Sequence, residues 1–264
     1  AKKRKIPIFH MEAGNRCFDQ RVPEEINRKI VDHISDINLT YTENARKYLL
    51  MEGLRKDFIF NVGSPMKEIL NSYKKQISKS EILEKLKLIK NEYIVVSVHR
   101  EENLDISDNF SNILDAIDEV SSNNDKQIIF STHPRTRKKL EEMKRDKNSK
   151  ISYIKPLGFF DYIFLQLNAF VTLSDSGTLA EEASLLKFPS VSLRNSTERP
   201  EAIDSGSLIL GSVDKNNIIN SINLALNLKN IIEPSDYDSP NCSEKVIKII
   251  QGYTSIVNSE VWKK

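Results

Sequence analysis

The sequence is poor in cysteine. Its 264 residues include only Cys17 and Cys242, which lie far apart in the chain. Two distant thiols cannot build a disulfide framework, and no group of His, Cys and Asp residues has the spacing of a metal site. We therefore expect reduced thiols in a cytoplasmic protein that uses neither a metal nor another cofactor.

Long apolar runs are also absent. The longest candidate, residues 159–173, is interrupted by Asp161, Gln166 and Asn168, whereas a membrane-spanning helix needs about 20 mostly apolar residues. The basic start Ala1-Lys-Lys-Arg-Lys5 has no apolar region behind it, unlike a secretory signal. The sequence therefore predicts no association with a membrane.

Several nucleotide-binding and catalytic fingerprints are missing. The chain has no Gly-x-Gly-x-x-Gly and no P-loop, which argues against NAD and P-loop nucleotide chemistry. Ser176 lies in Asp-Ser-Gly-Thr rather than in the Gly-x-Ser-x-Gly of a hydrolase. The net charge is only +2 and the lysines are spread over predicted helix faces, so no nucleic-acid partner is expected.

What the chain does contain is a regular alternation of strand and helix patterns. Strands are predicted at residues 6–11, 37–41, 58–62, 93–98, 127–131, 151–154, 169–173, 190–193 and 207–211. Helices are predicted at residues 23–33, 42–50, 65–73, 80–88, 109–120, 134–145, 160–167, 178–186, 216–226 and 243–257. Such alternation is typical of an α/β fold in which helices cover parallel sheets.

The pattern divides into two domains. Residues 76–264 contain a complete doubly wound series and are predicted to form a nucleotide-binding Rossmann-like domain with a C-terminal helix. Residues 1–75 resemble only the C-terminal portion of another Rossmann-like domain. Because the chain opens on a strand followed at once by candidate site residues, we expect the front of this first domain to be missing.

One stretch has the order strand, tight turn, helix. The apolar run 169–173 is followed by turn formers and then by a helix pattern. In a parallel sheet this turn lies at the carboxyl ends of the strands, where a helix start attracts phosphate and Gly177 leaves room for it. Glu182, just over one helical turn later, can face the same ligand. The alternative is an ordinary helix start, since Thr178-x-x-Glu181 is itself a capping box.

Four loops at predicted strand ends are rich in polar residues: Glu12 with the loop to Arg28, 99–103, 174–182 and 197–201. Two Rossmann-like domains with their sheets facing a cleft would bring these loops together. His99 directly follows an apolar strand and is a candidate for catalysis, with a purely structural histidine as the alternative. His133 also lies at a strand end and is a possible ligand contact.

Taken together, five blocks resemble one family. They are His10-Met-Glu-Ala-Gly14, Pro23-Glu-Glu-Ile-Asn-Arg28, Val98-His-Arg-Glu-Glu102, Asp175-Ser-Gly-Thr-Leu-Ala-Glu-Glu182 and Thr197-Glu-Arg-Pro-Glu201. In residues and order they look like the non-hydrolysing UDP-N-acetylglucosamine 2-epimerases. The resemblance implies a glycosyltransferase-B architecture, a UDP-sugar substrate and a homodimer. It also implies that the family's first phosphate-binding block and a catalytic aspartate belong to the missing front.

Two departures from the common family pattern concern the substrate. Thr178 stands where the family usually has a second glycine, and the loop 16–22 is shorter. Both features look like the capsule and O-antigen branch, which makes UDP-N-acetyl-L-fucosamine from a UDP-2-acetamido-2,6-dideoxy-L-talose. The sugar therefore stays open between this pair and UDP-N-acetylglucosamine with UDP-N-acetylmannosamine.

The family's chemistry inverts C2 by eliminating UDP across C1–C2 and adding it back on the other face. The resemblance implies that Glu12 and Glu24 carry out the proton transfers. It also implies that His99 stabilises the diphosphate. By the same resemblance, Arg28 and Arg199 hold phosphate and hydroxyl oxygens. The backbone N–H groups of Ser176 and Gly177 bind the diphosphate. Glu182 binds the ribose, and Tyr162 lies near uracil. For Tyr162 simple core packing is the alternative.

Two other functions share parts of this pattern. A glycosyltransferase of the same architecture would need the nucleotide-binding turn but not the pair Glu12 and Glu24. A non-catalytic UDP-sugar-binding protein would need neither carboxylate. An assay with the UDP-sugar and no acceptor separates both from an epimerase.

Overall fold

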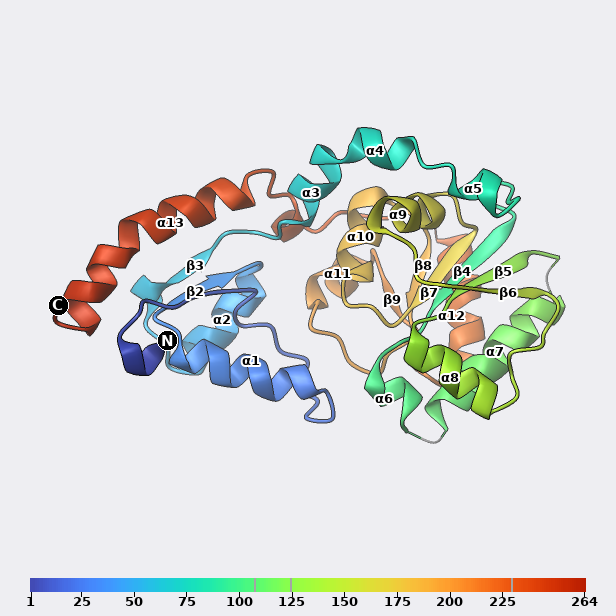
Figure 1. Cartoon of the computed structure of the whole chain (residues 1–264), viewed down its shortest axis with the longest axis horizontal. Helices are drawn as coiled ribbons and strands as arrows, with labels where there is room; N and C mark the ends of the chain where they lie inside the picture. Colours follow the sequence, from blue (N-terminus) through green and yellow to red (C-terminus); the bar gives the residue numbers. More distant parts are fainter. Residues whose placement is uncertain (107, 124, 229) are drawn as a thin grey trace. The chain divides into compact units, whose positions relative to one another are not determined.

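The chain folds into two compact units, each built on an open parallel sheet (Figure 1). The computed structural model describes residues 1–106, 108–123, 125–228 and 230–264. The first unit contains residues 1–72, 198–201 and 234–264, and the second contains residues 73–197 and 202–233. The predicted α/β class with parallel sheets is confirmed.

The elements follow the predicted alternation closely. The first unit contains β1 (Phe9–Met11), α1 (Pro23–Ile34), β2 (Ile37–Thr40), α2 (Glu43–Met51), β3 (Ile59–Asn61), α3 (Met66–Ser72) and α13 (Cys242–Ile256). The second contains α4 (Lys74–Ser78), α5 (Ile82–Lys85), β4 (Tyr93–Ser97), α6 (Glu101–Leu104), α7 (Asn109–Asn123), β5 (Gln127–Ser131), α8 (Pro134–Glu142), β6 (Ile151–Ile154), α9 (Phe159–Leu167), β7 (Val171–Ser174), α10 (Leu179–Leu186), β8 (Ser190–Ser192), β9 (Ile209–Leu210) and α12 (Lys215–Asn227). Helix α11 (Pro200–Asp204) begins in residues of the first unit and ends in residues of the second.

The differences from prediction concern short helices. Helices α4, α6 and α11 have only four or five residues each, too few for a periodic apolar pattern to appear in the sequence. The helix predicted at residues 80–88 is shorter in the structure. It ends early because Lys87 adopts a left-handed backbone conformation, with φ of +56°, which a right-handed helix cannot continue.

The grouping of the last helix corrects the predicted domain boundaries. The second domain was expected to run from residue 76 to residue 264, whereas α13 packs on the sheet of the first unit. Its side chains Cys242 and Val246 form one apolar core with Ile37 and Leu39 of β2. Helix α13 therefore covers a sheet whose strands precede it by about two hundred residues, and chain order alone does not reveal this.

The second unit has the strand order of a Rossmann fold. Its six strands run β6-β5-β4-β7-β8-β9, all parallel. In chain order this is 3-2-1-4-5-6, so the direction of winding reverses between β4 and β7. The loops after these two strands consequently diverge at the point where open sheets of this kind bind their ligands.

Strand β4 lies at the centre of this sheet and is buried on both faces. Ile94 and Val96 join the apolar core that includes α7 and α12, while Tyr93 and Val95 join the core that includes α9 (Figure 1). A strand covered by helices on both sides reads as a continuous apolar run rather than an alternating one. That is why residues 93–98 were recognisable as a central strand.

The turn after β1 is held tightly against α2. Ala13 is fully buried beside Leu49 and Ile59. Gly14 has a φ of +81°, and a Cβ atom there would lie 2.3 Å from the carbonyl oxygen of Ala45. Both the backbone conformation and the available space therefore require glycine at position 14.

Cys17 and Cys242 are both buried, and neither forms a disulfide within the described part of the chain. Among the helices of the described residues, none combines the length and the apolar composition that a bilayer-crossing segment needs.

We predict that Gly14→Ala destabilises the protein by at least about 2 kcal/mol, because alanine disfavours a positive φ and its methyl group collides with backbone. Gly252→Ala is the matched control. Gly252 lies within α13 with open space around its Cα, so alanine there should raise stability by up to about 1 kcal/mol. Urea unfolding measures both changes. An unchanged midpoint for Gly14→Ala would show that the turn accepts a side chain.

Candidate active site

Glu12 is paired with arginine at the carboxyl end of β1. Its Oε1 atom accepts a hydrogen bond from Arg199 Nη2 at 3.0 Å and another from the Asn15 side chain at 3.1 Å. Arg28 Nη2 lies 3.8 Å from the same oxygen and 3.9 Å from Glu198. The structure thus brings together three of the predicted site residues, from the turn after β1, from α1 and from residues 198–201, within the first unit.

Glu12 also has an unusual backbone conformation. Its φ is +60°, in the left-handed region that costs a residue with a side chain roughly 1–2 kcal/mol. Such a conformation persists only where the surrounding contacts impose it. In this conformation 40% of the Glu12 side chain remains exposed.

The neighbouring glutamates at the start of α1 have different surroundings. Pro23 occupies the first turn, as predicted, and Glu24 beside it is exposed. Glu25 is fully buried and accepts hydrogen bonds from the backbone N–H groups of Cys17 at 2.9 Å and Phe18 at 3.3 Å. Glu25 therefore has a structural role, while Glu24 presents its carboxylate to solvent.

His99 and Asp175 meet at the winding reversal of the second unit. His99 follows β4, Asp175 follows β7, and the His99 Nδ1 atom lies 3.1 Å from Asp175 Oδ1. The Asp175 carboxylate also accepts from the backbone N–H groups of His99 and Arg100 and from the side-chain amide of Asn103. One fully buried carboxylate therefore fixes the whole loop that carries His99.

The contact with Asp175 changes the acidity of both groups. The hydrogen bond from the imidazole to Asp175 raises the pKa of His99 above its ordinary value. Burial alone would raise the pKa of Asp175, but the hydrogen bond and charge of His99, together with the backbone N–H groups of His99 and Arg100, outweigh it, so the pKa is lowered overall. A raised histidine pKa adds stability below about pH 6.5 that is lost as the pH rises through the folded-state value.

The turn after β7 joins the sheet to α10. The Ser176 N–H donates to Ser174 Oγ at 3.1 Å, and the Ser176 and Thr178 hydroxyls lie 3.0 Å apart. Thr178 is the N-cap residue of α10, but its side chain makes no capping hydrogen bond. The alternative reading of this stretch as a capping box is therefore wrong, and the Thr178 side chain interacts with Glu182 instead.

Glu182 and Tyr162 belong to a buried polar group behind this turn. Gln166 Nε2 on α9 donates to Glu182 Oε2 at 2.8 Å, and burial raises the pKa of the Glu182 carboxyl. The Tyr162 ring packs against the apolar core of α9 and β4, while its hydroxyl interacts with Ser97 and Ser174. Burial raises the pKa of Tyr162 as well. Tyr162 thus combines core packing with a polar contact at the carboxyl edge.

Sequence reasoning did not single out several residues that organise these groups. Asp175 lies in the polar loop 174–182 and Asn103 in the polar loop 99–103, so the strand-end positions were a usable signal for both. Gln166, Arg16 and Asp32 gave no signal, because nothing in their local pattern reveals a partner far away in the chain. His133, the other predicted histidine, is exposed at the start of α8. Across the described residues, no cluster of three or more His, Cys, Asp or Glu side chains is suited to a metal ion.

The fold and the positions of the polar residues together define the class of protein. Each unit is a helix-covered parallel sheet, and in each the polar groups gather at the carboxyl ends of strands, as in glycosyltransferase-B-like proteins. A trehalose-phosphate synthase from Burkholderia vietnamiensis shares this fold, with a TM-score of 0.61 over 94% of this chain and 70% of that chain, at 12% identity.

The family follows from closer matches. The family described as UDP-N-acetylglucosamine 2-epimerase matches residues 1–251. The chain belongs to this family of isomerases, which confirms the resemblance seen in the sequence.

Individual relatives support the assignment. The UDP-N-acetylglucosamine 2-epimerase of Methanocaldococcus jannaschii is 37% identical over 95% of this chain and 70% of its own length. Its structure in complex with UDP-GlcNAc and UDP has a TM-score of 0.89 over 96% of this chain and 71% of that chain. A UDP-N-acetylglucosamine 2-epimerase from Rickettsia bellii is 43% identical, with a TM-score of 0.92, covering 100% of this chain and 72% of that chain.

We predict that Asp175→Asn lowers the pKa of His99 toward about 6.5, because the amide can no longer stabilise the charged imidazole. Titration of the His99 ring signals by NMR measures the shift. Asp214→Asn is the control, since that carboxylate caps α12 and does not contact His99. A His99 pKa that is the same in the unaltered and Asp175→Asn proteins would contradict the electrostatic account.

Proposed function

We propose that the protein is a UDP-sugar 2-epimerase that inverts C2 of a UDP-2-acetamido sugar by eliminating UDP and adding it back. The observation that carries the proposal is a glutamate held between two guanidinium groups at a strand end, in a chain of the epimerase family. The relative from Methanocaldococcus jannaschii was solved with UDP-GlcNAc and UDP, which supports a nucleotide-sugar ligand for this chain as well.

The proton transfers belong to two carboxylates. The C2 proton is weakly acidic, so its removal requires a base fixed at short range. Glu12 takes this role: it removes the proton, the C2–H electron pair forms the C1=C2 bond, and the C1–O bond to UDP breaks. Glu24, in its protonated form, then gives a proton to C2 on the opposite face as UDP adds back to C1, and exchange with solvent removes the proton from Glu12 and restores that of Glu24. The strained backbone and arginine contacts of Glu12 are consistent with a fixed position.

The departing diphosphate is stabilised by cations and backbone N–H groups. The raised pKa of His99 favours its protonated form, which suits an anion that gains charge as the C1–O bond breaks. The turn at Ser176 and Gly177 lies at the start of α10, where the Ser176 N–H exchanges its hydrogen bond to Ser174 Oγ for one to the diphosphate. Arg28 and Arg199 hold phosphate and sugar oxygens through their planar donors.

The uridine half of the ligand is bound by the second unit. Glu182 accepts hydrogen bonds from the ribose hydroxyls, with its position set by the amide of Gln166. Tyr162 lies beside uracil. These roles match the location of both side chains behind the turn after β7.

Two sugar pairs are candidates. UDP-N-acetylglucosamine with UDP-N-acetylmannosamine is favoured by the names of the relatives at 37% and 40% identity. A second candidate is the UDP-2-acetamido-2,6-dideoxy-L-talose and UDP-N-acetyl-L-fucosamine pair, favoured by Thr178 in place of a glycine. The family does accept different sugars, since a relative at 31% identity from Pseudomonas aeruginosa is named for a UDP-diacetamido-glucuronate.

We expect epimerised product with deuterium at C2 when each UDP-sugar is incubated in heavy water without an acceptor. Elimination sends the C2 proton to carboxylates that exchange with solvent, so it must return as deuterium. The enzyme should be expressed from its complete coding sequence, and ¹H NMR reads both the configuration and the label. Product that retains hydrogen at C2 would exclude elimination. Turnover only after addition of a sugar acceptor would indicate a glycosyltransferase instead.

We predict that Glu182→Ala weakens UDP binding by about 1.5–3 kcal/mol for each hydrogen bond lost to a charged acceptor. Isothermal titration calorimetry with UDP measures the change. Glu92→Ala serves as the control, because Glu92 precedes β4 and therefore lies at the opposite, amino end of the sheet. UDP binding that is equally tight in both variants would remove Glu182 from the site.

A further inference from the structure

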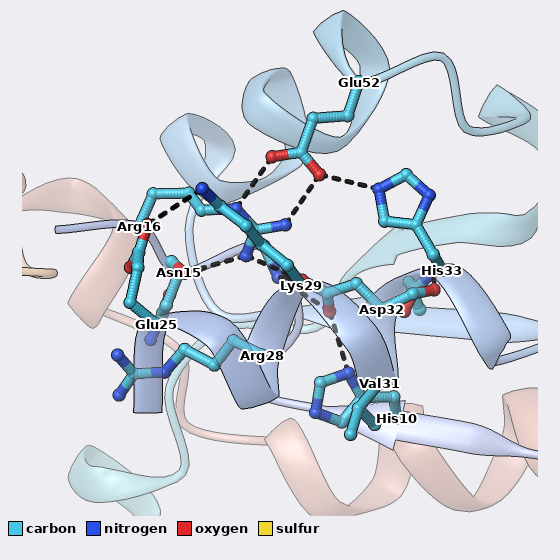
Figure 2. Close-up of polar contacts among 12 residues, drawn as sticks. His10, Asn15, Arg16, Glu25, Arg28, Lys29, Val31, Asp32, His33 and Glu52 are labelled. Carbon is cyan, nitrogen blue, oxygen red and sulfur yellow. Dashed lines mark hydrogen bonds and ion pairs between the residues drawn. The ribbon is translucent and has the colours of Figure 1, made fainter. Parts of the chain in front are cut away.

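A buried carboxylate on α1 contacts the turn that carries Glu12. Asp32 is fully buried, and its oxygens accept from the Gly14 N–H at 3.2 and 3.3 Å. Its Oδ1 atom lies 2.8 Å from His10 Nδ1, and its Oδ2 atom lies 2.7 Å from Arg16 Nη1 (Figure 2). A single side chain thus contacts residues on both sides of Glu12.

These contacts surround the strained residue. His10 lies two positions before Glu12, Gly14 lies two positions after it, and Arg16 follows two positions later. A left-handed conformation at a glutamate needs neighbours that leave the backbone no alternative. Asp32 meets this need because it fixes the strand before the turn and the loop after it from one rigid helix position.

Arg16 extends the contact toward Glu12 itself. Its guanidinium is buried and forms a two-pronged hydrogen bond with Glu52, at 2.8 Å from Nε and 2.7 Å from Nη2 (Figure 2). Arg16 Nη1 also donates to the Asn15 carbonyl at 2.9 Å, and the Asn15 side chain donates to Glu12. Asp32 is therefore linked to the Glu12 carboxylate through Arg16 and then through the backbone and side chain of Asn15.

The charges in this group are mutually stabilised. The hydrogen bond from Arg16 lowers the pKa of Glu52, whose carboxylate also lies 3.0 Å from His33 Nε2. Burial lowers the pKa of Arg16, but hydrogen bonds with Glu52 and Asp32 more than compensate, so its pKa is raised overall. Buried ion pairs of this kind add little net stability compared with apolar side chains of the same size. Such pairs can instead fix a geometry.

A second buried aspartate, Asp36, provides a matched comparison for Asp32. Asp36 lies between α1 and β2, and it accepts from the Ile8 N–H at 2.9 Å and from Lys2 at 2.5 Å. Like Asp32, it is a buried carboxylate that accepts from a backbone N–H group and pairs with a cationic side chain. Because Ile8 and Asp36 precede parallel strands, Asp36 lies at the amino end of the sheet, away from Glu12.

We propose that Asp32 is a positioning residue for Glu12: its contacts with His10, Gly14 and Arg16 hold the turn in the one conformation in which the Glu12 carboxylate can take the C2 proton. The proposal rests on the epimerase function proposed above. Asp32 acts through the turn and does not touch the substrate.

The test compares Asp32→Asn with Asp36→Asn in the enzyme expressed from its complete coding sequence. Asparagine keeps the shape of the side chain but removes the charge opposite Arg16. Because a misplacement of about 1 Å can slow a positioned reaction about 10²-fold, we expect kcat to fall by about that factor. KM for the UDP-sugar should change less than about threefold, and C2 deuterium exchange should slow in parallel with kcat. Asp36→Asn should be less stable but should retain kcat.

A variant of Arg16, the ion-pair partner of Asp32, keeps the test decisive if Asp32→Asn does not fold. Arg16→Lys preserves the charge but cannot form the two-pronged contact with Glu52, so kcat should fall while KM is retained. Wild-type kcat in folded Asp32→Asn, or in Arg16→Lys where only that variant folds, overturns the proposal. An equal loss of kcat in Asp36→Asn also overturns it, because the effect would then reflect stability alone.

Glu12→Gln separates this proposal from the proposed function. If Glu12→Gln abolishes turnover while Asp32→Asn turns over normally, the epimerase assignment stands and the positioning role of Asp32 fails. If Glu12→Gln itself turns over at the wild-type rate, Glu12 is not the base and the proposed mechanism fails with it.

Discussion

A buried aspartate carboxylate that accepts backbone N–H groups holds the reactive loop in each unit. Asp175 binds the N–H groups of His99 and Arg100, and Asp32 binds that of Gly14. Hydrogen bonds to an ionised acceptor are shorter and stronger than those between neutral groups, so each carboxylate fixes backbone rather than merely a side chain. Removal of such a charge leaves its buried donors without a partner, which costs far more than the contact contributes.

Helix α1 shows how strongly this requirement shapes the first unit. A helix on the surface of a globular domain normally turns its apolar stripe toward the core. In α1 the buried positions are Glu25 and Asp32, which lie seven residues apart on one face, while Ile26 and Ile30 are about half exposed. The carboxylates take the inner face because the loops after β1 present N–H groups and cations that an apolar side chain could not satisfy.

The success of sequence reasoning followed from topology. In a parallel sheet every strand ends at the same edge, so residues that follow predicted strands share a location even when their partners are unknown. That argument placed Glu12, His99 and Ser176 correctly at strand ends. The strands themselves were identified by their apolar runs, because strands such as residues 93–98 are buried on both faces.

The parts that escaped prediction depend on contacts between distant residues. Arg16 reaches Glu52 across 36 positions, and Asp32 reaches His10 across 22. No local pattern encodes such a pair. The inward carboxylates of α1 were hidden for the opposite reason: the helix pattern was clear, but the usual assignment of its inner face is reversed. The packing of α13 on β2 also has no local signal.

The distance between α13 and β2 along the chain has a consequence for how the protein folds. The core of the first unit joins Ile37 and Leu39 to Cys242, Val246 and Val257, so it cannot be completed before residue 257 has been synthesised. The second unit draws its strands from the continuous span 93–210. Contacts between residues far apart in sequence form slowly, because a long loop must close first. During synthesis the second unit is therefore finished first, and the sheet that holds Glu12 is covered only once α13 has been made.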